Sequence, residues 1–306
     1  MTIPNPAATG TAAPLAAPAP KADVAVVGQR GRTARRTLAY ILLISYAVLM
    51  FIPFAWSVSS SFKTQADSVR DLALIPSPVS LEGWQTAFNE LDPSLPRLFF
   101  NSTVIAAAVT LSNVVLGSMA GYAFARLRFP GREVLFILVL ATMMIPDQLR
   151  LVPIYQILRA LGLLQDERQY FGVVLVLAIS AVSIFLMRQY FMSIPRALEE
   201  AAKIDGAGFY TTFVRVVLPL ATPAIAAIAI LQFQGTWNGF FWPTVILQDR
   251  ANWTLPLGIA QFQDLYATRW PPLMAVVVMS TVPILILYVF FQRYFVEGIA
   301  AAGVKG

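Results

Sequence analysis

The chain has 306 residues, of which 58% are hydrophobic and 12% are charged, and its formal net charge is +6. Soluble globular domains carry about 25% charged residues, so this composition indicates a chain that lies largely in lipid. The sequence has no cysteine and no histidine, which excludes disulfides, thiolate catalysis, Cys/His metal sites and a histidine proton relay. The charges stand between long apolar runs, so membrane topology explains them better than binding to nucleic acid does.

Residues 1–36 are rich in Ala, Pro and Thr and end in a basic stretch. This composition predicts a disordered tail. The tail is not typical of a secretory signal, because the apolar run after it is too long and shows no small-residue cleavage pattern. We expect residues 37–306 to form a transmembrane domain.

Six apolar segments of membrane-spanning length follow the tail, since a transmembrane helix needs about 20 mostly apolar residues. The third of them is apolar as far as Pro146, and Asp147 and Arg150 then interrupt it. We therefore expect an all-α polytopic membrane protein with six transmembrane helices, at residues 38–58, 101–124, 134–154, 171–187, 216–233 (or 216–246) and 273–291.

The distribution of Lys and Arg predicts the orientation of the chain. With both termini in the cytoplasm, the cytoplasmic segments hold 14 of these residues and the outer segments hold 8. This split favours a multi-pass plasma-membrane protein with both ends inside. The long loops 59–100 and 248–272 then lie outside, and the aromatic residues of the second loop suit either the lipid interface or contact with a partner.

The interiors of the first, second, fifth and sixth predicted spans contain no charged residue. A charge at mid-bilayer costs about 2.5–3.5 kcal/mol on insertion scales and usually marks a coupling site for ions or protons. The absence of such a charge argues against an ion-coupled secondary transporter. A membrane-embedded enzyme would be expected to have a cluster of carboxylates within or at the edge of a span, and none is obvious in the sequence. Energy for transport is then expected to come from another protein.

Uncharged polar and aromatic residues do occur within the spans. Amides hydrogen-bond hydroxyl groups in both directions, and rings stack on the apolar faces of sugars. A candidate translocation path for a polyhydroxylated solute therefore includes Asn113, Gln232, Gln234, Trp237 and Asn238. Polar residues also commonly join neighbouring transmembrane helices, and this second interpretation is the one that we favour.

The loop 193–215 contains a predicted short helix between Pro195 and Gly206, two residues that suit a helix start and a helix stop. Acidic residues near its start complement the helix macrodipole, and small residues after them would let another protein approach the backbone. From its residues alone, the helix is either a docking site for a partner or an amphipathic helix at the membrane surface.

The order Glu200-Ala201-Ala202, Gly206, Val216 and Leu218-Pro219 resembles the EAA loop of ABC importer permeases, with Val216 where that family usually has Ile. The resemblance covers nearly all of the chain after residue 36. It includes Ser61-Phe62-Lys63, Asn101-Ser102, Tyr122 to Gly131, Ile145-Pro146, Val152 to Tyr155, Leu161 to Leu163, and Phe295 to Gly306. Together these stretches are similar to the MalG-type carbohydrate permeases, which have the MetI-like ABC permease fold.

The resemblance implies that this chain and a second, MalF-like permease enclose one translocation path. It further implies an ABC ATPase dimer bound on the cytoplasmic side and an extracytoplasmic substrate-binding protein outside. ATP and magnesium would bind to the ATPase, whereas this chain would bind no cofactor or metal and catalyse no reaction. The sequence of this chain has no Walker A pattern, the loop that binds the phosphates of ATP. The implied solute is a sugar or a sugar-like molecule, with glycerol phosphate, a polyol or another small solute as the alternative.

The same resemblance assigns roles to particular residues. Glu200 would be the polar anchor of the coupling helix, and Gly206 would permit the turn after it. Loop 248–272 corresponds to the segment that reaches the binding protein in the maltose system, and Lys305-Gly306 lies near the ATPases there. The residues implied in coupling to the ATPase are Glu199, Glu200, Ala201, Ala202, Asp205, Gly206, Leu218 and Pro219.

Overall fold

The computed structural model describes residues 27–71, 73–263 and 267–303, with side chains from residue 35 to residue 292 of these ranges. The chain divides into two compact units, residues 1–53 and 54–306. Most of the predicted tail 1–36 and the terminal Lys305-Gly306 lie outside the described residues.

Helix α1 (Val27–Ser61) begins within the segment that the composition assigned to the tail. The prolines of that segment all precede residue 21, so none of them interrupts the helix from Val27 onward. The part Arg35–Ser61 has the length and apolarity of a membrane span. Its apolar residues are distributed all round the helix, as expected for a helix in lipid.

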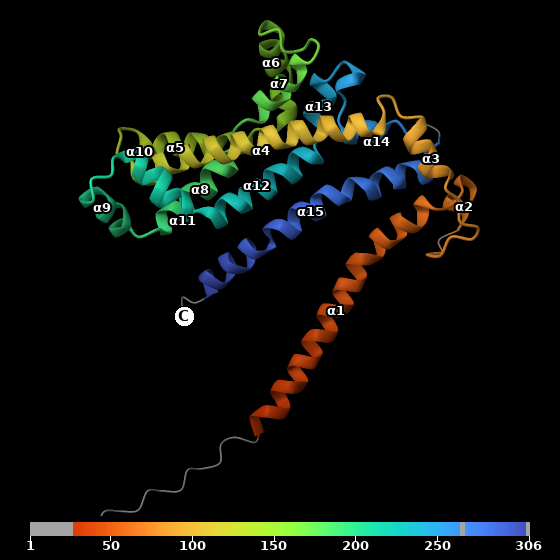
Figure 1. The fold of residues 1–306 in the computed structure, drawn as a ribbon, viewed down its shortest axis with the longest axis horizontal. Coiled ribbons are helices and arrows are strands. Elements are labelled where there is room, and N and C mark those ends of the chain that lie inside the picture. The colour runs from red at the N-terminus through yellow and green to blue at the C-terminus, as the bar shows by residue number, and fades with distance from the viewer. Residues whose placement is uncertain (1–26, 72, 264–266, 304–306) are drawn as a thin grey trace, which may run out of the picture. The chain divides into compact units, whose positions relative to one another are not determined.

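The centre of the unit 54–306 is α4 (Leu95–Arg126), which packs against α8 (Ala181–Ser193) and α12 (Thr222–Trp237) (Figure 1). A Cβ atom on Gly121 would lie 2.5 Å from the Cβ of Met187, and glycine therefore lets α4 and α8 approach closely. Gly117, one helical turn earlier, meets Ser183 in the same way. Such a pair of small residues four positions apart is typical of interfaces between transmembrane helices.

The last helix, α15 (Trp270–Gly303), packs against α12 and against α3 (Glu82–Asn89). Together with α2 (Gln65–Arg70), α3 belongs to the first long loop. The second long loop contains a short 3-10 turn (Arg250–Asn252) and α14 (Leu255–Ala260), which packs against α4.

Three helices of the described residues are singly long and apolar enough to cross a membrane, and there are up to six if each bent pair of helices counts as one span. The helix formed by α5 (Arg132–Ala141) and a short 3-10 turn meets α6 (Asp147–Ala160) at 104°. Helix α7 (Arg168–Leu177) meets α8 at 48°. The segment Phe209–Leu220 meets α12 at 75°.

The bends change the course of three predicted spans. Segment 134–154 is broken before Asp147 because Pro146 cannot donate a backbone hydrogen bond, and 171–187 is broken where Ser180 starts a new helix. The fifth helix runs over Thr222–Trp237 rather than from residue 216. It does not continue to residue 246, because the chain leaves the helix at Asn238 before α13 (Phe241–Ile246) begins.

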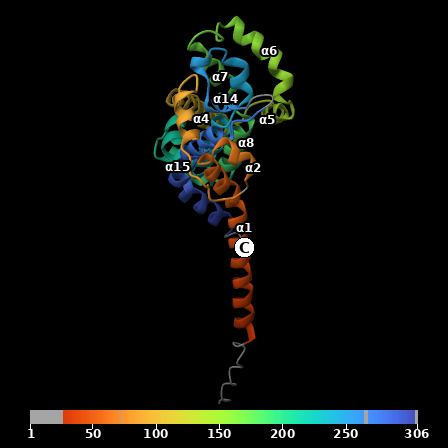
Figure 2. The same ribbon diagram turned by 90° about the vertical axis from the view of Figure 1, so that its right-hand side faces the viewer.

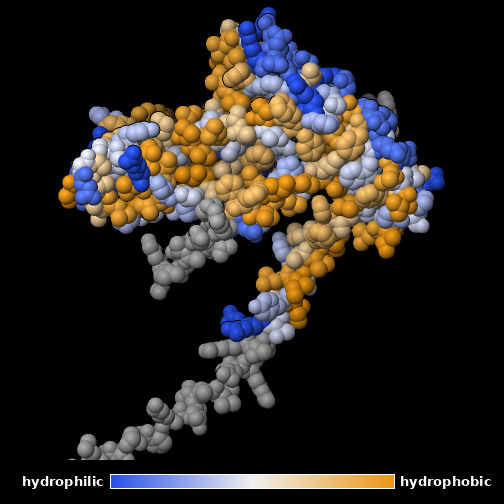
Figure 3. All heavy atoms as spheres, in the orientation of Figure 1, coloured by the Kyte–Doolittle hydropathy of each residue, from blue (hydrophilic) through white to orange (hydrophobic). Residues whose placement is uncertain are grey.

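Helix α6 extends away from the bundle formed by α4, α8 and α12 in both views (Figures 1 and 2). The bundle itself exposes many apolar side chains, such as Leu111 on α4, which is 65% exposed. Figure 3 shows apolar residues over much of the visible surface of the described part. A membrane-embedded bundle is expected to present such a surface to lipid.

Candidate functional site

Helix α9 (Arg196–Ile204) forms in the predicted loop between Pro195 and Gly206. Gly206 adopts a left-handed conformation with φ of +81°. Its N–H donates to the carbonyl of Lys203 at 3.0 Å, and the next N–H, that of Ala207, donates to the carbonyl of Ala202 at 2.9 Å. These two bonds form a Schellman cap, for which glycine is the preferred residue.

Glu199 attaches α9 to the end of α4. Its Oε1 atom lies 2.5 Å from Nε of Arg126, and its Oε2 atom accepts a hydrogen bond of 3.0 Å from the hydroxyl of Tyr122. The side chains of Arg126 and Glu199 are only 7% and 11% exposed. Arg126 also donates to the carbonyl of Ile194 at 2.6 Å. Helix α9, the predicted coupling helix, is therefore held from within the subunit by a buried ion pair and two further polar contacts.

The ring of Tyr122 extends this attachment into an aromatic cluster. Its centroid lies 4.7 Å from the ring of Phe213, 5.5 Å from that of Phe209 and 5.6 Å from that of Phe191. Phe191 precedes α9 in α8, whereas Phe209 and Phe213 follow it in α10 (Phe209–Thr212) and in the π-helical turn Phe213–Val217. One tyrosine therefore connects α4 with both chain segments that flank α9.

The opposite side of α9 is open. Glu200, Ala201, Asp205 and Gly206 are exposed, Ala202 is half-buried, and Ile204 is 88% exposed. The resemblance gave the role of polar anchor to Glu200, whereas the residue anchored within this subunit is Glu199. Predicted coupling residues Leu218 and Pro219 lie apart from this exposed surface along the chain, in α11 (Leu218–Leu220).

Asn113 joins the two halves of a bent span. It is fully buried, and its amide nitrogen donates to the carbonyl of Leu177 at 2.7 Å, at the end of α7. Its oxygen accepts from the backbone N–H of Ser180 at 2.8 Å, just before α8, and from the hydroxyl of Ser183 at 3.1 Å. Helix ends leave such backbone groups without partners, so one carboxamide satisfies both ends of the break.

The other candidates for the translocation path separate into two groups. Gln232 donates to the hydroxyls of Ser180 and Ser183, and the indole of Trp237, 2% exposed, donates to the carbonyl of Ser280 on α15. Gln234, on α12, and Asn238, directly after the end of α12, are instead exposed. The interpretation as contacts between helices fits Asn113, Gln232 and Trp237, while Gln234 and Asn238 stay available to a solute.

Loop 248–272 is held against the first long loop and α4. Asn101 donates to the carbonyls of Ala251 and Trp253 at 2.9 and 2.8 Å. Arg269 binds the carboxylate of Glu90 at 2.7 Å, and this hydrogen bond lowers the pKa of Glu90. These contacts give the loop a defined position at one end of the bundle.

Several structural residues of the site were not singled out from the sequence. Tyr122 and Arg126 lie in a stretch quoted for the family resemblance, but no pattern linked them to Glu199. The spacing of Gly117 and Gly121 was a readable signal for close helix packing. Lys63, in the Ser-x-Lys stretch, is 1% exposed and donates to the carbonyl of Asp71 at 2.7 Å, which fixes the start of the first loop.

Comparison with known proteins establishes the family. The sequence profile described as "Binding-protein-dependent transport system inner membrane component" matches residues 113–300. The arabinooligosaccharides transport system permease protein AraQ of Halalkalibacterium halodurans is 36% identical over 275 residues, which cover 88% of this chain and 97% of AraQ. The sn-glycerol-3-phosphate transport system permease protein UgpE of Brucella abortus is 29% identical over 88% of this chain and 97% of its own.

A solved structure agrees with this result. The crystal structure of a bacterial ABC transporter involved in the import of the acidic polysaccharide alginate contains a chain that is 26% identical, with a TM-score of 0.74. The match covers 89% of this chain and 100% of the chain from the alginate importer. The present chain belongs to the family of inner-membrane permeases of binding-protein-dependent ABC importers. The predicted MetI-like permease fold is confirmed, and the ABC importer class takes the place of the secondary-transporter alternative.

Proposed function

We propose that this chain carries a sugar, in particular an oligosaccharide, inward across the plasma membrane as one of two permeases of an importer. The likeness to an arabinooligosaccharide permease and to an alginate importer supports this solute class. The exposed side chains of Gln234, on α12, and Asn238, directly after it, are neutral amides, which suit hydroxyl groups.

Glycerol phosphate is the second candidate solute, favoured by the likeness to UgpE. A phosphate group is usually bound by Arg or Lys, and residues 216–246 contain neither. The lack of Arg and Lys in this segment therefore favours a polyhydroxylated solute over a phosphorylated one.

The proposed partners are a second, MalF-like permease, an ABC ATPase dimer and an extracytoplasmic substrate-binding protein. The ATPase dimer would bind ATP and magnesium and perform all hydrolysis, while this chain holds no cofactor and catalyses no reaction. The single observation that carries the proposal is the environment of α9. Glu199 attaches this helix to α4, whereas the side that includes Glu200 is exposed. A helix of this kind suits docking into a cleft of the ATPase.

Movement of α9 would be passed to the bundle through α4. The buried contacts of Glu199 with Tyr122 and Arg126 connect α9 to the last turn of α4, which packs against α8 and α12. Closure of the ATPase pair would then shift the balance between inward- and outward-facing arrangements of the bundle. Such a shift requires that the ATPase bind the two arrangements with different affinities.

Charge reversal on the exposed side of α9 tests the proposal. In the complete importer reconstituted in liposomes, we expect Glu200→Lys to reduce ATP-driven uptake about tenfold, equivalent to about 1.4 kcal/mol, while basal ATP hydrolysis persists. The exposed Glu167, at the start of α7, offers the control Glu167→Lys, which should transport normally. Normal uptake by Glu200→Lys would contradict the docking role, as would ATP hydrolysis by this chain purified alone.

A further inference from the structure

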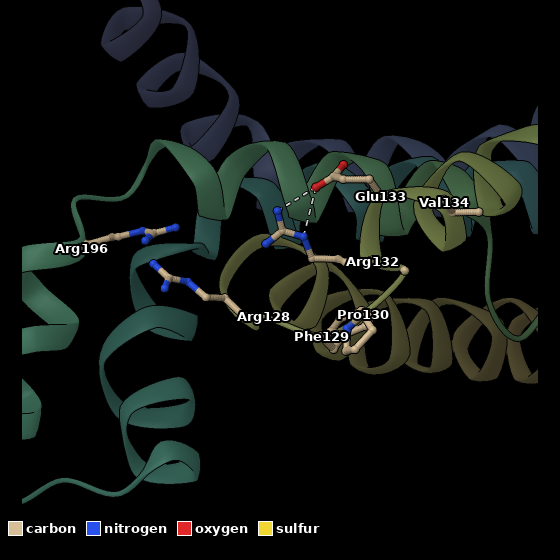
Figure 4. A pocket seen from close by; sticks show the side chains of 8 residues that line it. Arg128, Phe129, Pro130, Arg132, Glu133, Val134 and Arg196 are labelled. Atoms are coloured by element: carbon tan, nitrogen blue, oxygen red, sulfur yellow. Dashed lines mark hydrogen bonds and ion pairs between the residues drawn. The ribbon is translucent and has the colours of Figure 1, made fainter.

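A cavity of about 730 Å³ lies beside α9 (Figure 4). It is formed by the turn between α4 and α5 and by the first residue of α9. Its lining is rich in arginine and consists of Arg128, Phe129, Pro130, Gly131, Arg132, Glu133, Val134 and Arg196. This turn belongs to the stretch Tyr122 to Gly131, which the coupling role leaves without a function.

The one carboxylate in the lining is already paired. Glu133 accepts from Arg132 at 2.7 Å and lies 3.2 Å from Arg188, which itself stacks on the ring of Phe136 at 4.1 Å. Arg132 is held further by the carbonyl of Leu127 at 3.1 Å. Glu133 therefore has no capacity left to neutralise the other arginines of the cavity.

Arg128 and Arg196 supply an unbalanced positive charge. Their guanidinium groups extend toward one another across the cavity from two different elements (Figure 4). Among the side chains that the structure describes, no carboxylate is paired with either of them. Two like charges that face one another repel, so an anion between them would be bound by both. Arginine is well suited to phosphate because its planar N–H groups bind two oxygen atoms at once.

The cavity opens beside an apolar helix surface. Val134 lines the cavity and is 62% exposed, and Ile137 and Leu138 on the same helix are 63% and 57% exposed. With a rise of 1.5 Å per residue, Leu138 lies about 9 Å along α5 from Arg132. The two cations thus lie next to an exposed apolar surface, close enough for one phospholipid to contact both.

We propose that this cavity binds the headgroup phosphate of an anionic phospholipid, with Arg128 and Arg196 on the phosphate and the acyl chains along α5. Basic pockets between membrane helices at the cytoplasmic side are suited to such headgroups. An acidic surface of a partner protein would match the charge but not the adjoining apolar surface of α5. The site is independent of the solute, and Arg196 is the residue of α9 that lines it.

Binding of short-chain lipids to the full-length chain in mild detergent tests the site. The probes are dihexanoylphosphatidylglycerol, dihexanoylphosphatidylcholine and inorganic phosphate, and the apparent Kd follows from the rise in unfolding temperature with ligand. We expect saturable binding of the phosphatidylglycerol and much weaker binding of the other two. Arg128→Gln and Arg196→Gln should each weaken it about fivefold, as expected for one cation near a headgroup.

Two further variants separate a specific site from general charge. Arg128→Lys keeps the cation but loses the bidentate contact, so its affinity should lie between those of the wild type and Arg128→Gln. The exposed Arg215→Gln removes the same charge outside the cavity and should bind as the wild type does. Equal binding of the phosphatidylcholine, equal binding of free phosphate, or an equal loss in Arg215→Gln would overturn the proposal. Unchanged lipid binding in both Arg128→Gln and Arg196→Gln would also overturn it. If, in that case, Arg128→Gln weakened binding of the ATPase to the permease, the cavity would be a protein interface.

Discussion

Glu199 and Glu200 are adjacent in sequence but have opposite environments. Consecutive residues of an α-helix point about 100° apart, so a helix that buries one of them against α4 turns the other outward. Glu199 reaches Tyr122 and Arg126 inside the subunit, while Glu200 is left on the exposed side. The acidic pair therefore combines one residue that attaches α9 to α4 with one that is left exposed.

Loss of the Glu199 carboxylate should destabilise the protein strongly. Glu199→Gln leaves Arg126 buried without its counter-charge, a change that costs about 3–5 kcal/mol in buried ion pairs. We expect a clear fall in the unfolding temperature, with little change for Glu200→Gln. The double variant with Arg126→Gln should recover part of the loss. If Glu199→Gln and Glu200→Gln unfold at the same temperature, the buried pair contributes no stability.

Gly206 is required for its backbone conformation and not for space. No atom lies within 4 Å of a Cβ placed there, yet its φ is +81°. Gly206→Ala should therefore cost about 1 kcal/mol, whereas Gly206→Asn should cost less because asparagine tolerates this conformation. Denaturant unfolding of both variants measures the difference. Gly206→Ala as stable as the wild type would show that the left-handed cap is unimportant.

At the scale of elements, the bends determine which backbone groups need partners. Asn113→Leu removes the partners of the Leu177 carbonyl and the Ser180 N–H, and each unsatisfied buried group costs about 1–3 kcal/mol. We expect a lower unfolding temperature and faster hydrogen exchange at the amide of Ser180. Ser112→Ala is the control, since the Ser112 hydroxyl donates to the carbonyl of Val109 at 2.9 Å, within its own helix turn. Unchanged exchange at Ser180 would contradict this role of Asn113.

Hydropathy predicted α4 and α15 well because each is a continuous apolar run with no internal break. It did not predict the bends, because the direction of a helix is not encoded in its mean apolarity. Local signals were present at Pro146, which removes a hydrogen-bond donor, and at Ser180, whose hydroxyl caps α8. The contact of Glu199 with Arg126 could not be predicted, because it joins residues of two helices far apart in sequence.

At the scale of the whole molecule, the orientation in the membrane is still a prediction. The excess of Lys and Arg in one set of loops places loop 59–100 outside and loop 193–215 inside. Alkaline phosphatase fused after residue 90 should be active, whereas a fluorescent protein fused after residue 205 should be fluorescent. Both positions are exposed, so neither fusion requires a buried segment to move. The opposite pair of results would reverse the topology.

The bent spans also have a consequence for biosynthesis. Helices α5 and α7 have 10 residues each, about 15 Å in length, which is half of the hydrocarbon thickness of about 30 Å. A half-length helix cannot be released alone into lipid, because its terminal backbone groups would lack partners there. Helix α4, made earlier on the ribosome, supplies Asn113 to the junction of α7 and α8. We therefore expect the span formed by α7 and α8 to enter lipid stably only when it packs against α4, whose Asn113 satisfies the backbone groups at its break.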